Sequence, residues 1–223
     1  MAPRERTLSV GAKRRRDRAA GRSRHRWPWP LIGATAGIGL LVVGVAAMNS
    51  LSGAGERPVP YDIGQPGIGA MAPDFSLPRA EGGTFRLSDQ RGKQVLLYFH
   101  EGLGCDPCWR QIDDIQADLA KFNAVGIDEV VAISIDPTSA QLGRAQRDSI
   151  SLPVLADSDL TVSGLYGTLG YGMMNGTRPG HTFILVGPDG KIRWRADYGG
   201  PPNFTMYVAD DALLSELRRA LGA

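Results

Sequence analysis

The chain has only two cysteines, Cys105 and Cys108, and both stand in the short sequence EGLGCDPCWRQ with two residues between them. Such a pair can form an inert structural disulfide, contribute to a zinc site, or act as a redox-active dithiol. A disulfide that closes so short a loop gains little entropic stabilisation. A zinc site needs about four ligands, and the chain has no second cysteine pair to supply them. The spacing therefore favours thiol–disulfide exchange.

The segments around the cysteines predict how the pair is positioned. The apolar run 94–100 (QVLLYFH) is typical of a strand buried on both faces of a sheet. Apolar residues then recur at steps of three and four along 109–122, which predicts a helix that ends near Gly126. Cys105 would lie at the helix N-terminus, where unpaired N–H groups and the helix dipole favour a thiolate. Cys108 would follow one turn later, within bonding range.

The two residues between the cysteines have opposite effects. Pro107 suits the first helical turn, because its fixed φ is compatible with a helix and its missing N–H would have had no partner there. Asp106 places a carboxylate beside Cys105, and this charge disfavours the thiolate. We therefore expect the pKa of Cys105 to be higher than a basic or neutral spacer residue would give, and Asp106→Asn to lower it.

The apolar patterns of the remaining chain predict an α/β domain. Short apolar runs predict strands, and apolar residues at helical spacing predict helices. The further strands are expected at 75–77, 84–87, 129–135, 152–155, 182–186 and 191–195, and the further helices at 139–148 and 209–221. Strands that alternate with helices and close in an antiparallel hairpin around GPDG are typical of a three-layer α/β domain.

The net charge of +2 conceals an uneven distribution along the chain. Residues 1–30 contain ten Lys or Arg against two acidic residues, and their low apolar content predicts a disordered basic arm. Residues 31–48 (LIGATAGIGLLVVGVAAM) carry no charge. As a helix they would span roughly 27 Å, close to the hydrocarbon thickness of a bilayer. We therefore expect a single transmembrane helix.

The flanks of the apolar segment predict its orientation. Trp27 and Trp29 stand at its entry, and the excess of basic residues lies upstream of it. The N-terminus is therefore predicted to stay in the cytoplasm, with residues 49–66 as a linker and 67–223 as one domain on the far side of the cell membrane. A cleavable signal peptide is the alternative, and it would also export the domain. The spanning segment argues against nucleic acid as the partner of the basic arm.

The sequence GAMAPDFSLPRAEGGTFRLSDQRGKQVLLYFHEGLGCDPC, which begins at Gly69, resembles the thioredoxin-like redoxins of the alkyl hydroperoxide reductase/thiol-specific antioxidant (AhpC/TSA) group and their membrane-anchored thiol-disulfide relatives. The later HTFILVGPDGKI stretch continues the resemblance. It implies a thioredoxin-like fold with a mixed central sheet, Cys105 as the attacking thiol and Cys108 as the resolving thiol. We expect no cofactor. The expected partners are protein thiols or disulfides outside the cytoplasm, because the predicted transmembrane helix would place the domain there.

Departures from that resemblance bear on the activity. Similar peroxiredoxins carry a threonine three residues before the peroxidatic cysteine and a proline further upstream, where this chain has Gly102 and, near the proline position, Tyr98. A peroxidase is therefore an alternative that these positions disfavour. Thioredoxins carry a cis-proline directly before the strand that faces the active site, and Pro179 is displaced from that place by one residue.

His181 gives a third alternative. A histidine just before the same strand resembles the copper-delivering Sco family, although the Sco cysteines are separated by three residues rather than two. Cys105, Cys108 and His181 together offer two thiolates and an imidazole, a ligand set suited to Cu(I). His100 and Glu101, at the end of the strand before the cysteines, are candidates for moving a proton during exchange.

Overall fold

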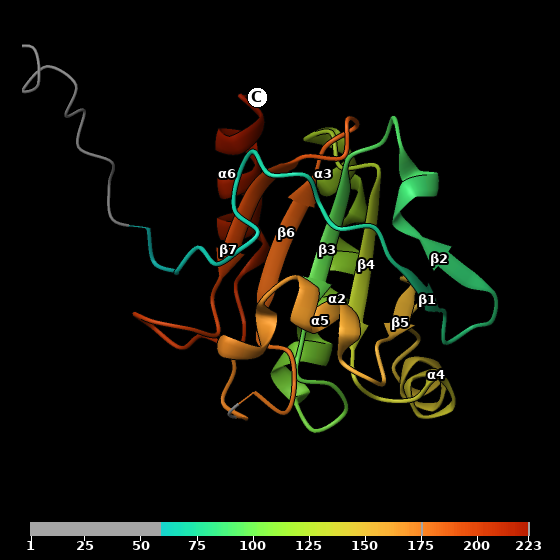
Figure 1. Cartoon of the computed structure of the whole chain (residues 1–223). Helices are drawn as coiled ribbons and strands as arrows, with labels where there is room; N and C mark the ends of the chain where they lie inside the picture. The colour runs from blue at the N-terminus through green and yellow to red at the C-terminus, as the bar shows by residue number, and fades with distance from the viewer. Residues whose placement is uncertain (1–58, 175, 223) are drawn as a thin grey trace, which may run out of the picture. The chain divides into compact units, whose positions relative to one another are not determined.

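A computed structural model describes residues 59–174 and 176–222, and the structural statements below concern these residues (Figure 1). The predicted basic arm (1–30), the predicted transmembrane segment (31–48) and most of the predicted linker (49–66) lie outside this part of the chain. Within residues 59–174 and 176–222, no helix is both long enough and apolar enough to cross a membrane.

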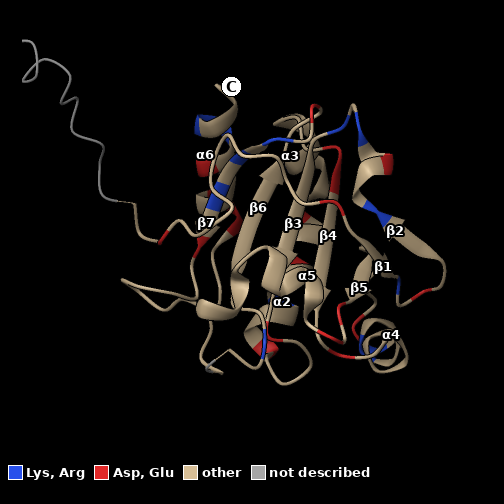
Figure 2. Cartoon of the chain, viewed as in Figure 1, with Lys and Arg blue, Asp and Glu red and all other residues tan. Residues whose placement is uncertain are grey.

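A mixed five-stranded sheet forms the centre of the domain, as predicted. Its strands, in spatial order, are β5 (Val154–Ala156), β4 (Glu129–Ser134), β3 (Val95–Phe99), β6 (Thr182–Val186) and β7 (Ile192–Asp197). The pairs β3–β4 and β4–β5 are parallel, whereas β3–β6 and β6–β7 are antiparallel. Figure 2 shows that β3 and β6 carry no charged residues, as expected for strands covered on both faces.

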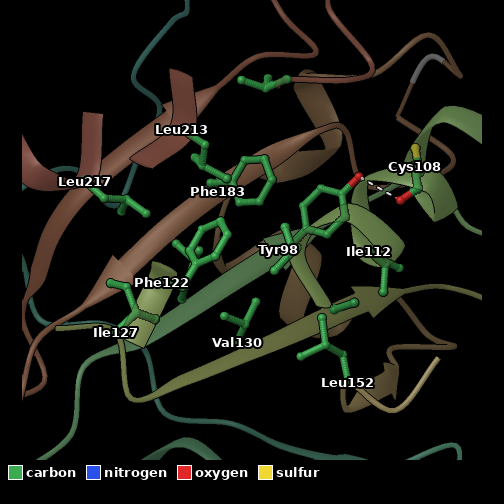
Figure 3. Packing of buried hydrophobic residues seen from close by; sticks show 14 of the residues in the cluster. Tyr98, Cys108, Ile112, Phe122, Ile127, Val130, Leu152, Phe183, Leu213 and Leu217 are labelled. Carbon is green, nitrogen blue, oxygen red and sulfur yellow. Dashed lines mark hydrogen bonds between the residues drawn. The ribbon is translucent and has the colours of Figure 1, made fainter. Parts of the chain in front are cut away.

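Helices cover one face of this sheet. They are α2 (Asp106–Ala117), α3 (Leu119–Ala124), α4 (Thr138–Arg147) and α6 (Asp210–Leu221). Their apolar residues pack with alternate residues of β3, namely Leu96 and Tyr98, in one buried cluster (Figure 3). The continuous apolar run of β3 is thereby explained, because its other side chains point to the opposite face.

The opposite face is covered by shorter elements. These are the hairpin of β1 (Ser76–Pro78) and β2 (Thr84–Arg86), the 3-10 turns η1 (Leu87–Gln90) and η2 (Thr168–Gly170), and α5 (Thr161–Leu165). The hairpin was predicted from the sequence, but α5 was not. The five residues of α5 are too few to show a period, and its first turn is capped from outside the helix: the Asp157 carboxylate accepts hydrogen bonds from Val162 N and Ser163 N.

The single helix predicted along 109–122 is interrupted. The structure divides it into α2 and α3 at Asp118, whose backbone angles (φ −102°, ψ 13°) are not helical. The apolar stripe nevertheless continues across the break, since Ile115 and Phe122 are both fully buried. The apolar spacing therefore predicted the buried face correctly, although it did not predict the break in the helix.

Part of the segment that composition predicts as a linker packs against the edge strand β7. Tyr61 is buried, and Gly64 N donates a hydrogen bond of 2.7 Å to Asp197 Oδ2. Arg195, which is paired with Asp197 and fully buried, donates to the carbonyl oxygen of Pro66 at 3.1 Å. Polar contacts of β7 thus hold this segment in place.

Candidate functional site

The two cysteines form a disulfide at the start of α2. Cys105 is the residue that caps the helix, and Cys108 lies in its first turn, with 5.3 Å between their Cα atoms. Cys108 N donates a hydrogen bond to Cys105 Sγ at 3.2 Å, so the sulfur occupies the anion-favouring end of the helix, as expected. Cys105 is 8 % exposed, whereas Cys108 is fully buried. Only Cys105 can be approached from solvent.

The spacer residues have the places that the sequence predicts. Pro107 lies in the first turn of α2, where its missing N–H leaves no helical partner unpaired. The Asp106 side chain is exposed and forms an ion pair with Arg144 Nη1 at 3.0 Å. Arg144 also lies over the ring of Trp109, with its guanidinium carbon 5.3 Å from the ring centroid. The sequence did not predict that Arg144 would pair with the carboxylate of Asp106.

The loop between β3 and α2 is fixed by backbone contacts around Gly102. The Gly102 carbonyl oxygen accepts hydrogen bonds from Cys105 N (3.1 Å) and Trp109 Nε1 (3.2 Å). Gly102 has φ +89°, and a Cβ placed on it would lie 1.8 Å from Asp136 Oδ2. Only glycine fits here, because both the backbone angle and the neighbouring carboxylate exclude a side chain.

Asp136 and Arg178 belong to this site and were missed by the sequence reasoning. Asp136 Oδ2 accepts a hydrogen bond from Leu103 N (2.7 Å), and Arg178 Nη1 lies 3.3 Å from Asp136 Oδ1 and 2.8 Å from the Glu101 carbonyl oxygen. Asp136 follows strand β4, which is parallel to β3, so their carboxyl ends meet at one edge of the sheet. That signal could have found Asp136, whereas no pattern around Arg178 distinguishes it.

Glu101 is buried rather than solvated. It is 6 % exposed, and its carboxylate accepts a hydrogen bond from Met173 N. Met173 and Met174 are 65 % and 49 % exposed, so they do not fill gaps in the interior as methionines in such a loop usually do. Glu101 therefore fastens the loop that follows η2 to the loop that precedes Cys105.

Two buried histidines lie on the same side of the sheet as the disulfide. His181 Nδ1 is 2.9 Å from the Tyr98 hydroxyl, and His100 Nδ1 accepts a hydrogen bond of 3.1 Å from Gly102 N. Burial lowers the pKa of His100 to about 4, and burial together with the nearby His100 lowers the pKa of His181 to about 3. Both imidazoles are therefore neutral near neutral pH.

The Cu(I) ligand set of the third alternative does not form a cluster. Among residues 59–174 and 176–222, no group of three or more His, Cys, Asp or Glu side chains is arranged to hold a metal ion. His181 instead has its Nδ1 paired with Tyr98. The displaced Pro179 is preceded by a trans peptide bond, since the cis bonds of the described chain are at Gln65–Pro66 and Pro201–Pro202.

A dithiol pair at the start of a helix, beside a mixed sheet of this topology, defines the class of thioredoxin-like redoxins. The family model described as the AhpC/TSA family matches residues 68–195. The chain therefore belongs to the AhpC/TSA family.

The relatives in this family include proteins of two kinds. Thiol-disulfide oxidoreductase ResA of Geobacillus thermodenitrificans is 30% identical over 127 residues, which are 56% of this chain and 67% of ResA. Peroxiredoxin Bcp of Escherichia coli is also 30% identical over 127 residues, 56% of this chain and 81% of Bcp. The crystal structure of peroxidoxin BcpB from Mycobacterium tuberculosis aligns with a TM-score of 0.57 and 25% identity, over 68% of this chain and 96% of BcpB. These relatives support thiol-based redox chemistry without selecting between the two kinds.

Proposed function

We propose that the protein is a thiol–disulfide oxidoreductase whose Cys105 thiolate attacks a substrate disulfide and whose Cys108 resolves the resulting mixed disulfide. The observation that carries the proposal is the unequal exposure of two disulfide-bonded cysteines: Cys105 is 8 % exposed and Cys108 is fully buried. A substrate sulfur can meet only Cys105, and the mixed disulfide that forms there has a second thiol beside it. Exchange needs this arrangement.

The surroundings of Gly102 favour this activity over a peroxidase. Peroxiredoxins that resemble the chain use a threonine at this position, and here the space for its side chain is occupied by the Asp136 carboxylate. The relatives named peroxiredoxin make peroxide reduction the second candidate, with Cys105 as the attacking thiol. Both candidates begin with the same thiolate and differ in what it attacks.

The proposed location is the outer side of the cell membrane, with residues 31–48 as a single anchor and the N-terminus in the cytoplasm. The supporting observations are the uncharged apolar segment and the basic excess upstream of it. Protein thiols and disulfides in that compartment are the proposed partners. Protease added to intact cells tests this part and should degrade the C-terminal domain. A domain that is degraded only after the cells are lysed would contradict the proposed location.

Insulin reduction separates the two activities. The full-length reduced protein should reduce insulin disulfides with dithiothreitol as the electron source, and Cys105→Ser should abolish this. Hydrogen peroxide consumption is measured on the same preparation. Peroxide consumption that depends on Cys105, with no insulin reduction by a folded protein, would favour the peroxidase instead.

Trapping of a covalent complex tests the assigned order of the two thiols. Cys108→Ala leaves the attacking thiol without its resolving partner, so mixed disulfides with substrate proteins should accumulate in the protein's own compartment. Cys105→Ala is the matched control and should trap none, because Cys108 is buried. Equal trapping by the two variants would contradict the assignment.

A further inference from the structure

An open pocket with a volume of about 320 Å³ lies where the end of α2, the start of α3 and the start of α6 meet. Aspartates from two sides line it: Asp114 and Asp118 at the end of α2, and Asp210 and Asp211 at the start of α6. Asp114 is nine residues beyond Cys105, which corresponds to roughly 14 Å along the helix. The pocket is therefore separate from the disulfide, and the proposed exchange does not use it.

The charged and polar neighbours leave this pocket acidic. Lys121 Nζ pairs with Asp118 Oδ2 at 2.8 Å, and the Tyr207 hydroxyl donates a hydrogen bond of 2.6 Å to Asp114 Oδ2. The guanidinium carbon of Arg110 lies 3.9 Å from the centroid of the Tyr207 ring. Four carboxylates against these two cations give the pocket a formal charge of −2 when all groups are ionised. Such a pocket attracts a positively charged ligand.

Asp210 carries an acceptor that the surrounding protein leaves free. It is 8 % exposed, and its Oδ1 accepts a hydrogen bond of 3.1 Å from Gln111 Nε2. Gln111 is itself fully buried, and its Oε1 accepts from Val208 N at 2.7 Å, so its amide is held in this orientation. Asp210 Oδ2 is buried without a hydrogen-bond partner among residues 59–174 and 176–222. A buried oxygen of this kind is costly unless a donor binds there.

The charges that face Asp210 make its ionisation depend on what the pocket holds. Burial raises the pKa of Asp210 to about 7. The other three carboxylates of the pocket raise this pKa further, and Lys121 lowers it. The Asp210 carboxyl therefore exchanges its proton near neutral pH. A cation placed at Oδ2 would favour the ionised carboxylate and displace that proton.

The arrangement of the carboxylates favours an organic cation over a metal ion. Ca²⁺ and Mg²⁺ bind about six or more oxygen ligands within about 2.0–2.6 Å. No group of three or more His, Cys, Asp or Glu side chains in the described part of the chain is arranged to hold such an ion. An organic cation can extend across the pocket. Ala117 and Ala209, which also line it, suit a methylene chain.

The single free oxygen of Asp210 favours an ammonium group over a guanidinium group. A guanidinium binds a carboxylate best through both oxygens at once, but Gln111 already occupies Oδ1 of Asp210. An ammonium group is a compact charge that carries its own donors, and one acceptor oxygen is enough to orient it. The free acceptor therefore suits an amine.

We propose that this pocket binds an alkylammonium ion, whose N–H groups donate to Asp210 Oδ2 while Asp114 and Asp211 supply further negative charge. The methylene chain lies against Ala117 and Ala209. A protonated Asp210 gives its proton to solvent when the cation binds, and no other covalent bond changes. The formal charge of the pocket favours a linear diamine with two ammonium groups. A lysine side chain of a partner protein presents the same group, so both sources need a probe.

Titration calorimetry of the full-length protein in detergent tests the site. The probe for a free diamine is 1,4-diaminobutane, and the probe for a lysine side chain is N-acetyl-lysine methylamide. Each is titrated at low salt and about pH 8, where Asp210 is ionised. The assay contains no disulfide substrate, so its result is independent of the proposed exchange.

One equivalent of at least one probe should bind. Tighter binding of the diamine would assign the pocket to free diamines, and equal or tighter binding of the blocked lysine would assign it to a partner protein. Saturable binding of neither probe at concentrations up to about 10 mM would overturn the proposal.

Two near-isosteric variants locate the binding. Asp210→Asn should weaken it by roughly 10- to 100-fold, because the charged acceptor is lost while the amide oxygen can still accept from Gln111. Asp113→Asn is the matched control, since Asp113 is an exposed carboxylate next to Asp114 on α2 that does not line the pocket. It should keep the affinity within about a factor of two. Equal weakening in both variants would indicate general charge attraction and overturn the site.

The pH dependence identifies Asp210 as the group that the cation meets. The wild-type affinity should fall by about tenfold per pH unit below about pH 7, because a proton competes for the carboxylate. Asp210→Asn should lose most of this dependence. A wild-type affinity that is constant between about pH 5 and pH 8 would overturn the proposal. If Asp210→Asn does not fold, an unchanged affinity in Asp211→Asn, which alters an exposed carboxylate of the same pocket, would overturn it.

Discussion

Gly102 is the residue at which this chain departs most clearly from the peroxiredoxins that it resembles. Its positive φ lets the loop turn toward α2, and its missing side chain leaves room for the Asp136 carboxylate, which accepts from Leu103 N. Where similar peroxiredoxins carry a threonine hydroxyl, this chain has a carboxylate that holds the loop.

Two glycines of the same loop should respond differently to substitution. Gly102→Ala should destabilise the protein by at least about 2 kcal/mol, because a Cβ meets Asp136 and the backbone is left-handed. Gly104→Ala should cost about 0.5 kcal/mol or less, since no atom lies within 4 Å of its Cβ position. Urea unfolding of both variants measures the difference. Equal losses would show that the loop is not held as described.

The ion pair of Asp106 and Arg144 should set the acidity of the attacking thiol. Arg144 offsets the spacer carboxylate, so Arg144→Gln should raise the pKa of Cys105 and Asp106→Asn should lower it. Both shifts should be modest, because the Asp106 side chain is 86% exposed and solvent screens its charge. The pH dependence of iodoacetamide alkylation in the reduced protein measures them. Shifts of the same sign in the two variants would contradict this account.

At the scale of elements, the edge strand β7 holds the segment that leads into the domain. Arg195 and Asp197 are both fully buried, and their pair also binds Thr182, Gly64 and the Pro66 carbonyl oxygen. Every polar atom brought into the interior here has a partner, which is the condition under which a buried ion pair is tolerated.

Loss of one member of this pair should therefore be costly. Arg195→Ala leaves Asp197 charged and buried, and we expect a loss of about 3–5 kcal/mol in the free energy of unfolding. Arg193→Ala is the control on the same strand, and its exposed pair with Asp189 should be worth about 1 kcal/mol or less. Chemical denaturation compares them. A loss for Arg195→Ala no larger than that of Arg193→Ala would argue against a structural role for the buried pair.

Sequence periodicity predicted the strands and the longer helices well, and it missed the break at Asp118 and the short helix α5. The run 94–100 and the stripe along 109–122 record burial directly, so β3 and the covering helices were placed within a few residues. The break at Asp118 and the helix α5 depend on single backbone positions and on a cap from Asp157. Contacts between distant segments decide such features, and a local pattern does not contain them.

At the scale of the whole molecule, the two buried histidines make stability depend on pH. The pKa of His100 is lowered to about 4 and that of His181 to about 3, whereas the unfolded chain binds these protons near the ordinary value of about 6.5. The unfolded state therefore holds more protons between these values. Stability from the neutral histidines is complete above about pH 6.5 and is lost as pH falls through about 4 for His100 and about 3 for His181.

Denaturation curves across this range check the effect. The free energy of unfolding should fall by up to about 1.4 kcal/mol per pH unit for each histidine. His181→Asn should remove its own share of the slope. A slope below pH 6 that is the same in wild type and in this variant would contradict the assignment.

The site was only partly predictable for the same reason that α5 and the break at Asp118 were not predicted. Cys105 and Cys108 are three positions apart in the sequence, so their proximity follows from helix geometry alone. Asp136 and Arg178 reach the loop from other parts of the chain, and the Tyr98–His181 pair joins β3 to the residue before β6. The sequence indicated that His181 would lie near the thiols, but its hydrogen-bond partner depends on the register of β3 and β6.

Cys108 is enclosed beneath Cys105, so the two sulfurs of the redox pair can react with an incoming molecule in one order only. Any incoming oxidant, reductant or alkylating agent reaches the outer sulfur first. The inner thiol can resolve a disulfide formed there, but it cannot remove an alkyl group. A bulky adduct on the outer atom would thus stall the protein without ever touching the inner one. Inhibitors of this molecule can therefore be designed against a single atom, and the untouched inner thiol decides whether the block reverses.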